Sequence, residues 1–194
     1  MDSVGPRETA MRRGPWRHTP GALLLVLTLM TAGYVGSHVA TGNFHTVVPG
    51  TLYRSGQLTA SQWAAAIHHY GIKSVLNLRG AHHASAWYQD EVHTAAQHGV
   101  AHYDVRMSAI RELDPGTRNA ILAILRQAPK PLVVHCRSGA DRAGLIAALY
   151  LFAMEGQQAE TAVQQLSLFY GHVPYLWSRS GAMERSFWRY VTLQ

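Results

Sequence analysis

Between residues 51 and 194 the chain alternates short apolar runs with longer stretches in which apolar positions recur at helical spacing. Residues 72–78 and 131–135 are apolar and rich in β-branched side chains, which is typical of buried strands. Strands that alternate with helices predict an α/β domain with a mainly parallel sheet of four to five strands, flanked by helices. We expect the strands over 51–54, 72–78, 100–105 and 131–135, and the helices over 59–71, 85–99, 115–128, 142–154, 158–171 and 180–191.

Capping residues mark the ends of two of these helices. Thr59 can cap the first helix, and Gly71 can end it, because glycine readily adopts the left-handed backbone that stops a helix. Asp114 followed by Pro115 is a capping residue before a proline in the first helical turn.

The segment over residues 21–40 contains no Asp, Glu, Lys or Arg, and about 20 apolar residues suffice to cross a bilayer. Basic residues precede it, so the positive-inside rule places the N-terminus in the cytoplasm and the rest outside it, in the periplasm of a bacterium. A cleaved signal peptide and a buried core helix are the alternatives. For cleavage after Ala40, His38 occupies a position that prefers a small residue, whereas cleavage after Gly33 or Ser37 stays open.

These patterns divide the chain into four parts. Residues 1–20 form a basic segment, 21–40 a transmembrane anchor or signal segment, 41–50 a linker and 51–194 one domain of ordinary size. The linker assignment rests on the Gly and Pro residues within it.

The composition is typical of a folded domain, and the net charge suits the binding of anions. Of the 194 residues, 47% are hydrophobic and 14% are charged, which is too apolar for disorder. The formal net charge of +6 suits an anionic substrate or a membrane surface. Cys136 is the only cysteine, so it has no partner for an internal disulfide. The twelve histidines show no spacing typical of a zinc site, and we expect no metal.

The stretch HCRSGADRAG, residues 135–144, carries the candidate chemistry. The strand over 131–135 delivers Cys136 to its carboxyl end, where open α/β sheets form their ligand crevices. Small residues after the cysteine let the backbone curl so that its amides form an anion-binding nest. The next helix begins near Arg142, whose planar guanidinium fits two phosphate oxygens. The small residues are Ser138, Gly139 and Ala140.

The same surroundings favour a reactive thiolate at Cys136. A free cysteine has a pKa of about 8.5, and a helix N-terminus with a nearby arginine lowers it. A thiolate at the floor of a phosphate cradle is placed for in-line attack on phosphorus, which gives a cysteinyl-phosphate that water later hydrolyses. Without such neighbours, a lone cysteine is more often a packing residue.

This stretch resembles the Cys-x5-Arg signature of the protein tyrosine phosphatase superfamily, above all its dual-specificity and lipid-phosphatase branch, which often reads HCxxGxDRTG. YRSGQ (53–57), VLNLRG (75–80) and WYQDE (87–91) are similar to segments of small bacterial and atypical plant and fungal members. The resemblance covers residues 48–193 and implies the cysteine-phosphatase fold.

The resemblance also implies roles for residues of the signature. Cys136 is the implied nucleophile, Arg142 the implied catalytic arginine, and His135 is implied to tune the thiolate, with no metal or other cofactor. The residues implied to bind phosphate are Arg137, Ser138, Gly139, Ala140, Asp141 and Arg142.

Two features depart from the family pattern. Most members have Ser or Thr after the arginine, whose hydroxyl helps the thiolate leave the phosphoenzyme, and Ala143 here implies slow hydrolysis of that intermediate. The usual acid is an Asp about 30 residues before the cysteine, but Asp104 lies inside an expected strand. Asp141 and Asp114 are the leading candidates for the general acid, with Glu112 behind them. Asp114 is equally well explained as a helix cap.

Two arginines outside the signature are further candidates. Arg54 and Arg79 lie at strand ends in motifs that resemble those of the family, so they are supporting residues that can line the pocket. Ordinary surface salt bridges are the alternative.

The sequence thus predicts a membrane-anchored phosphomonoester hydrolase of the dual-specificity or tyrosine type. Its expected partners are phosphotyrosine or phosphoserine proteins or phospholipid-type substrates, and no nucleic acid. A pseudophosphatase that binds phosphate without turnover is the alternative, supported by Ala143 and the unplaced acid. A rhodanese-like sulfur transferase also uses a cysteine loop at a strand end, but it fits the HCxxGxDR pattern less well.

Overall fold

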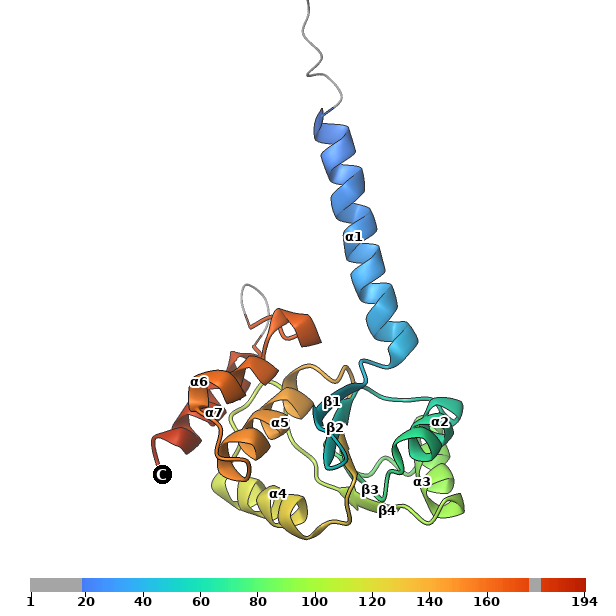
Figure 1. Ribbon diagram of the computed structural model, residues 1–194, viewed down its shortest axis with the longest axis vertical. Helices are drawn as coiled ribbons and strands as arrows, with labels where there is room; N and C mark the ends of the chain where they lie inside the picture. The colour runs from blue at the N-terminus through green and yellow to red at the C-terminus, as the bar shows by residue number, and fades with distance from the viewer. Residues whose placement is uncertain (1–18, 175–178) are drawn as a thin grey trace, which may run out of the picture. The chain divides into compact units, whose positions relative to one another are not determined.

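The computed structural model describes residues 19–174 and 179–194, and the chain divides into two compact units, Met1–Ser37 and His38–Gln194. Strands and helices alternate along the second unit (Figure 1). In chain order the elements are α1 (Thr19–Thr41), β1 (His45–Val48), β2 (Leu52–Ser55), α2 (Ala60–Tyr70), β3 (Ser74–Asn77), α3 (Ala86–Gln97), β4 (Ala101–Asp104), α4 (Pro115–Gln127), β5 (Leu132–His135), α5 (Asp141–Ala153), α6 (Ala159–Ala162), the 3-10 helices η1 (Val163–Gln165) and η2 (Leu168–Tyr170), and α7 (Gly181–Val191).

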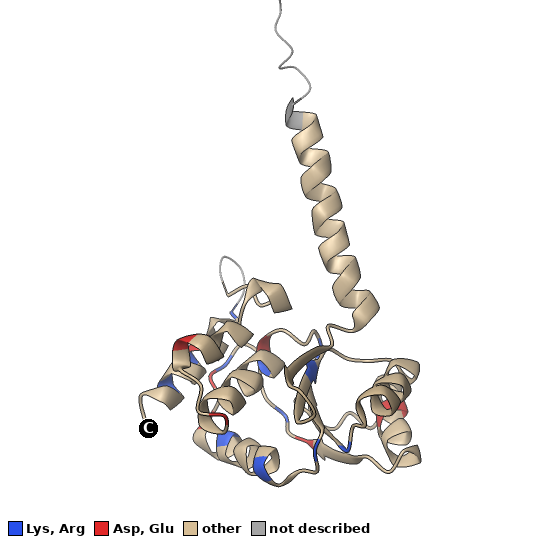
Figure 2. Ribbon diagram, in the orientation of Figure 1, with Lys and Arg blue, Asp and Glu red and all other residues tan. Residues whose placement is uncertain are grey.

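The helix α1 contains no Asp, Glu, Lys or Arg, and its described part is drawn in tan without blue or red in Figure 2. Within residues 21–41, a window of 18 residues has a mean hydropathy of 1.6. A helix of this length rises by about 31 Å, close to the ~30 Å hydrocarbon core of a bilayer. Its apolar side chains are exposed; Leu24, for example, is 67% exposed. By length and composition α1 is a candidate membrane span, and a signal sequence would meet the same criteria.

The second unit is built on a five-stranded sheet in the order β1-β2-β5-β3-β4. Strands β2, β5, β3 and β4 are parallel to one another, whereas β1 pairs with β2 in the antiparallel direction. This confirms the expected mainly parallel sheet flanked by helices.

The strand β1 lies inside residues 41–50, which the sequence pattern assigned to a linker. The run Thr46–Val48 is β-branched and favours extended backbone. Gly50, with a φ of +69°, lies in the turn that lets Val48 pair with Leu52. The expected linker therefore contributes the edge strand of the sheet.

Helices cover both faces of the sheet (Figure 1). On one face α4, α5 and α7 bury a large apolar cluster against Leu132 and Val134. On the other face α2 and α3 pack on Val133, next to the buried Trp63. Alternate residues of a strand point to opposite faces, and both faces of β5 are covered by helices, so all four of its residues are buried. The loop that follows therefore starts from a strand that is fixed on both sides.

The segment 158–171, expected as one helix, is broken into α6, η1 and η2. The carbonyl of Gln165 accepts a hydrogen bond of 2.6 Å from Nη1 of Arg54, which lies 111 residues away in the sequence. Ser167 then has extended backbone, with φ −133° and ψ 164°. A long-range contact therefore replaces the helical hydrogen bonding that local periodicity favours.

The carboxyl ends of the four parallel strands meet at one edge of the sheet. Ser55 aligns with His135, His135 aligns with Asn77, and Asn77 aligns with Asp104. The loops that follow these strands converge at this carboxyl edge, which is where open α/β sheets bind ligands.

Candidate active site

Residues 136–142, hereafter the signature loop, join β5 to the first turn of α5 at the carboxyl edge. Gly139 lies at its sharpest turn, with a φ of +77°. A Cβ at this position would lie 2.6 Å from the backbone nitrogen of Gly56. Only glycine therefore lets the loop lie this close to the end of β2.

The first carbonyls of the signature loop after Cys136 are bound by segments that precede α2. The carbonyl of Arg137 accepts a hydrogen bond from the amide of Gln57 at 3.1 Å. The carbonyl of Ser138 accepts one from Nδ2 of Asn43 at 2.8 Å, and Asn43 is buried. Asn43 belongs to the segment expected as a linker, so that segment is part of the support of the site.

Arg54 binds the next two carbonyls of the loop. Its Nη2 donates to the carbonyl oxygens of Gly139 at 2.6 Å and Ala140 at 3.0 Å, in addition to the Nη1 bond to Gln165. The side chain is fully buried, and its guanidinium lies 4.1 Å from the ring centre of Tyr170. Burial lowers the pKa of Arg54 to about 10, which leaves it charged at neutral pH. Arg54 therefore lies beneath the signature loop and forms neither the pocket wall nor a surface salt bridge.

The bound carbonyls determine where the amides of the signature loop point. In a trans peptide unit the N–H group points opposite to the C=O group. The carbonyls of residues 137–140 are bound to the body of the domain. The amides of residues 138–141 therefore point the other way, and with the N-terminus of α5 they form a nest that favours an anion; the amide of Ala140 also donates to Oγ of Ser138 at 3.4 Å.

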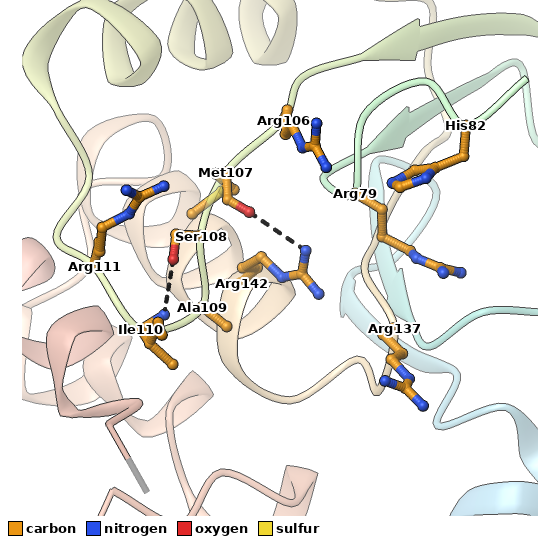
Figure 3. A pocket seen from close by; sticks show the side chains of 10 residues that line it. All are labelled: Arg79, His82, Arg106, Met107, Ser108, Ala109, Ile110, Arg111, Arg137 and Arg142. Atoms are coloured by element: carbon orange, nitrogen blue, oxygen red, sulfur yellow. Dashed lines mark hydrogen bonds between the residues drawn. The ribbon is translucent and has the colours of Figure 1, made fainter.

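The structure places both the expected nucleophile and the expected arginine on this loop. Cys136 is 1% exposed, and its amide donates to the carbonyl of Ser55 at 3.4 Å where the loop leaves β5. Nη1 of Arg142 donates to the carbonyls of Leu78 at 3.3 Å and Met107 at 3.4 Å, which fixes its guanidinium at the wall of a pocket (Figure 3).

This pocket has a volume of about 570 Å³ and is strongly cationic. Its walls come from the loops after β3 and β4 and from the signature loop (Figure 3). Five of its ten lining residues are arginines, and together they favour an anion with more than one negative charge. The five are Arg79, Arg106, Arg111, Arg137 and Arg142.

Seven of the ten lining residues were not predicted from the sequence, and three of the seven have basic side chains: His82, Arg106 and Arg111. In the loop from residue 106 to residue 114, the sequence indicated only the acidic residues Glu112 and Asp114 as candidates. A signal was present, since this loop follows a parallel strand and therefore reaches the same edge as Cys136.

Arg79 lies in the pocket wall, which is one of the two alternatives that the sequence left open. Its guanidinium carbon lies 3.4 Å from the ring centre of Trp87, and its Nη1 donates to Oε1 of Gln57 at 2.7 Å. The pKa of Arg79 is lowered mainly by its partial burial and, to a smaller extent, by the positive charge of Arg142.

The two leading candidates for the general acid are bound to other groups. Oδ1 of Asp141 lies 2.7 Å from Nδ1 of the buried His172. Oδ1 of Asp114 accepts a hydrogen bond from the amide of Thr117 at 2.9 Å, and this interaction lowers the pKa of Asp114. A general acid for neutral pH instead needs a raised pKa.

The remaining carboxylates near the site are also engaged. Glu112 forms ion pairs with Arg185 at 2.9 Å and Arg189 at 2.7 Å. Asp104 accepts a hydrogen bond from Nδ2 of Asn77 at 2.8 Å. Among the described residues that line the pocket, none is Asp or Glu.

Histidines of this region pair with a carboxylate. His135 is fully buried, and its Nε2 lies 3.0 Å from Oε1 of Glu91; Nε2 of His102 lies 2.8 Å from the same oxygen. Within residues 19–174 and 179–194, no three His, Cys, Asp or Glu side chains are grouped as a metal site requires.

Solved structures of phosphatases have the same fold. TpbA from P. aeruginosa is 23% identical, with 75% of this chain and 86% of that chain covered at a TM-score of 0.56. The catalytic domain of the PP-IP phosphatase SIW14 from S. cerevisiae is 19% identical, with 78% and 91% covered at a TM-score of 0.59. A putative phosphatase from Shewanella putrefaciens is 17% identical, with 76% and 93% covered at a TM-score of 0.58.

Sequence comparison extends this likeness from fold to family. No curated protein sequence matches the chain significantly. The sequence model of the tyrosine phosphatase family matches residues 35–165, which span β1 to β5, the signature loop and α5. Because the match covers more than half of the chain and includes the Cys-x5-Arg loop, the protein belongs to the tyrosine phosphatase family.

Proposed function

We propose that the protein hydrolyses phosphate monoesters through a cysteinyl-phosphate. The sulfur of Cys136 attacks phosphorus, and the bond from phosphorus to the leaving oxygen breaks with its electron pair going to that oxygen. Water then attacks phosphorus, which releases inorganic phosphate and returns the thiolate. The observation that carries this proposal is the set of loop carbonyls bound from below, because it aims the amides of residues 138–141 at phosphoryl oxygens beside Arg142.

The pocket favours esters whose leaving oxygen departs without a strong acid. No Asp or Glu occurs among the described lining residues, and Asp141 and Asp114 are bound to His172 and Thr117. A phenol of the tyrosine type has a pKa of about 10 and is far more acidic than an aliphatic alcohol. A phenolate therefore leaves more readily than a serine alkoxide, and we favour phosphotyrosine-type substrates over phosphoserine.

The arginines favour additional negative charge on the substrate. Arg106 and Arg111 lie on a loop separate from the signature loop, so they can bind a second anionic group while Arg142 binds the first. A phosphotyrosine flanked by acidic side chains meets this condition, as does a phospholipid-type headgroup with two phosphates. Similar proteins are consistent with this range: TpbA has been solved with phosphotyrosine bound, and SIW14 is described as a PP-IP phosphatase.

We expect the full-length protein to dephosphorylate a phosphotyrosine peptide at least about 100-fold faster than a phosphoserine peptide of the same sequence, since a missing general acid costs a poor leaving group most. Initial rates of phosphate release measure this ratio, with para-nitrophenyl phosphate and phenyl phosphate as a second pair that differs only in the leaving group. Equal rates for the two peptides would contradict the proposed dependence on the leaving group.

A phosphate-binding pseudophosphatase is the alternative. Ala143 and the absence of a carboxylate among the described pocket residues favour it, because both features slow turnover and leave the anion cradle intact. This protein would bind inorganic phosphate but release none from any of the four esters, so the same measurements distinguish the two functions.

We also propose that α1 anchors the protein in a membrane, with the phosphatase domain outside the cytoplasm and its phosphorylated substrates near the membrane. The length and hydropathy of residues 21–41 support the anchor. Four arginines before it support the orientation under the positive-inside rule: Arg7, Arg12, Arg13 and Arg17.

Protease added to spheroplasts should digest the membrane-bound phosphatase domain and leave a cytoplasmic marker protein intact. A domain protected from protease would contradict the orientation. A chain recovered in the soluble fraction with a shortened N-terminus would contradict the anchor.

A further inference from the structure

A buried carboxylate connects the neighbour of the nucleophile to an arginine of the pocket. Glu91, on α3, is 1% exposed. Its Oε1 accepts hydrogen bonds from Nε2 of His135 and Nε2 of His102, and its Oε2 accepts one from Nε2 of Gln57 at 2.6 Å. Burial alone would raise the pKa of Glu91, but the charge of His135 and these three hydrogen bonds hold it well below its ordinary value. Glu91 is therefore a buried negative charge at neutral pH.

The side chain of Gln57 connects Glu91 to Arg79, which lines the pocket. A side-chain amide donates hydrogen bonds through its nitrogen and accepts them through its oxygen. Because Nε2 of Gln57 donates to Glu91, its Oε1 is turned toward Arg79, whose Nη1 donates to it at 2.7 Å. The ring of Trp87 lies against the same guanidinium, so Arg79 is held from two sides while it lines the pocket near Arg137 (Figure 3).

We propose that Glu91 is a positioning residue for substrate binding, which fixes the orientation of Gln57 and thereby holds the guanidinium of Arg79 where it meets the phosphate-bearing substrate. This inference rests on the proposed function, since it assigns Arg79 to the anion bound above Cys136. It adds to that function a residue that contacts no substrate and is remote from the signature loop in sequence.

The chain of hydrogen bonds from Glu91 through Gln57 to Arg79, hereafter the relay, depends on the charge of Glu91 and not only on its shape. Glutamine at position 91 keeps the shape of the side chain, and its carbonyl oxygen can still accept from both histidines. Its amide nitrogen, however, is a donor, so Gln57 must turn its oxygen toward position 91. The amide nitrogen of Gln57 then faces Arg79, two donors meet, and the guanidinium loses its position.

Glu91→Gln is expected to weaken the binding of inorganic phosphate on the order of 10-fold, measured by isothermal titration calorimetry on the full-length protein. The KM for para-nitrophenyl phosphate should rise by a similar factor, with kcat changed by less than about 3-fold, as expected for a lost binding interaction. Asp90→Asn is the matched control, because it removes the same charge from an exposed neighbour on α3.

A charge swap provides the decisive variant. In the double variant Glu91→Gln with Gln57→Glu, the carboxylate at position 57 accepts from both the amide at position 91 and Arg79, so phosphate affinity should return to within about 3-fold of the wild type. In the background of Arg79→Gln, Glu91→Gln should cause no further loss of affinity. Should Glu91→Gln fail to fold in thermal unfolding, Gln57→Leu, at a partly exposed position, should produce the same loss.

Phosphate binding is measured without turnover, which separates the relay from the proposed function. A wild type that binds phosphate but hydrolyses no ester would refute the function, and the affinities of the variants would still decide the relay. The relay is overturned by unchanged affinity in folded Glu91→Gln or Gln57→Leu, by a swap that restores nothing, by losses that add to that of Arg79→Gln, or by a wild type that does not bind phosphate.

Discussion

Replacing Cys136 by serine is expected to lower the steady-state hydrolysis of para-nitrophenyl phosphate by a factor on the order of 10³ or more, because an alcohol is a far weaker nucleophile than a thiolate. Serine differs from cysteine by one atom, and the carbonyls of the signature loop stay bound by Gln57, Asn43 and Arg54. The affinity for inorganic phosphate should therefore remain within a few-fold of the wild type. Hydrolysis assays and calorimetry on the full-length protein in detergent measure the two effects separately.

The single cysteine offers a chemical control for this variant. Because Cys136 is the only cysteine in the chain, iodoacetate can modify no other thiol. Incorporation of one carboxymethyl group should abolish turnover, and inorganic phosphate should slow the modification. A serine variant that keeps more than a few per cent of the activity would show that Cys136 is not the nucleophile.

Ala143 affects the second step of the reaction, the hydrolysis of the cysteinyl-phosphate. It is fully buried and packs in the same apolar cluster as Cys136. Because its side chain is a methyl group, no hydroxyl at that position assists departure of the thiolate. Rapid mixing of the wild type should give a burst of para-nitrophenol followed by slow release, and Ala143→Ser should shrink the burst by accelerating the second step. A linear trace from the wild type would place the slow step before the intermediate.

The features predicted correctly from sequence depend on short-range physics. Thr59 forms the capping box of α2 with Gln62, and Asp114 caps α4, because the capping partner lies only three residues away. The apolar run at β5 is buried on both faces, and the loop after it contains glycine where the backbone has a positive φ. In each case the residue type and its immediate neighbours determine the conformation.

The features that were missed depend on contacts between distant segments. Asn43 binds a carbonyl 95 residues further along the chain, and Arg54 binds one 85 residues further along. Residue type does not reveal such contacts: the sequence suggested a pocket or surface arginine at position 54, whereas Arg54 is fully buried. Likewise the place of Asp141 in the signature made it a candidate acid, and its contact with His172, 31 residues away, could not be predicted from local sequence. Sequence therefore located the reacting loop, and the tertiary contacts identified what holds it in shape.

Arg54→Leu is expected to destabilise the domain by about 2–4 kcal/mol and to lower turnover by at least about 100-fold. The carbonyls of Gly139 and Gln165 lose their buried donors, at about 1–3 kcal/mol each, while removal of a buried cation offsets part of this cost. The carbonyl of Ala140 keeps a bond from the amide of Gly144. The activity should fall further than stability predicts, because a peptide unit whose carbonyl is free can rotate and take the following amide out of the phosphate nest.

Two further variants distinguish the loss of positive charge from the loss of the hydrogen bonds that Arg54 donates to the carbonyls of Gly139, Ala140 and Gln165, hereafter the Arg54 clamp. Arg126→Leu removes a positive charge from an exposed site on α4 and should change neither the free energy of unfolding nor turnover. Arg54→Lys keeps the buried charge, but a single ammonium cannot reproduce the fork that reaches the carbonyls of Gly139, Ala140 and Gln165, so its loss of turnover should stay close to that of Arg54→Leu. Urea unfolding and kcat/KM, measured at a temperature where each variant is folded, give the two quantities. If Arg54→Leu is folded and keeps wild-type phosphate affinity and turnover, the signature loop holds its shape without the clamp, and the orientation of its amides must come from the loop sequence itself.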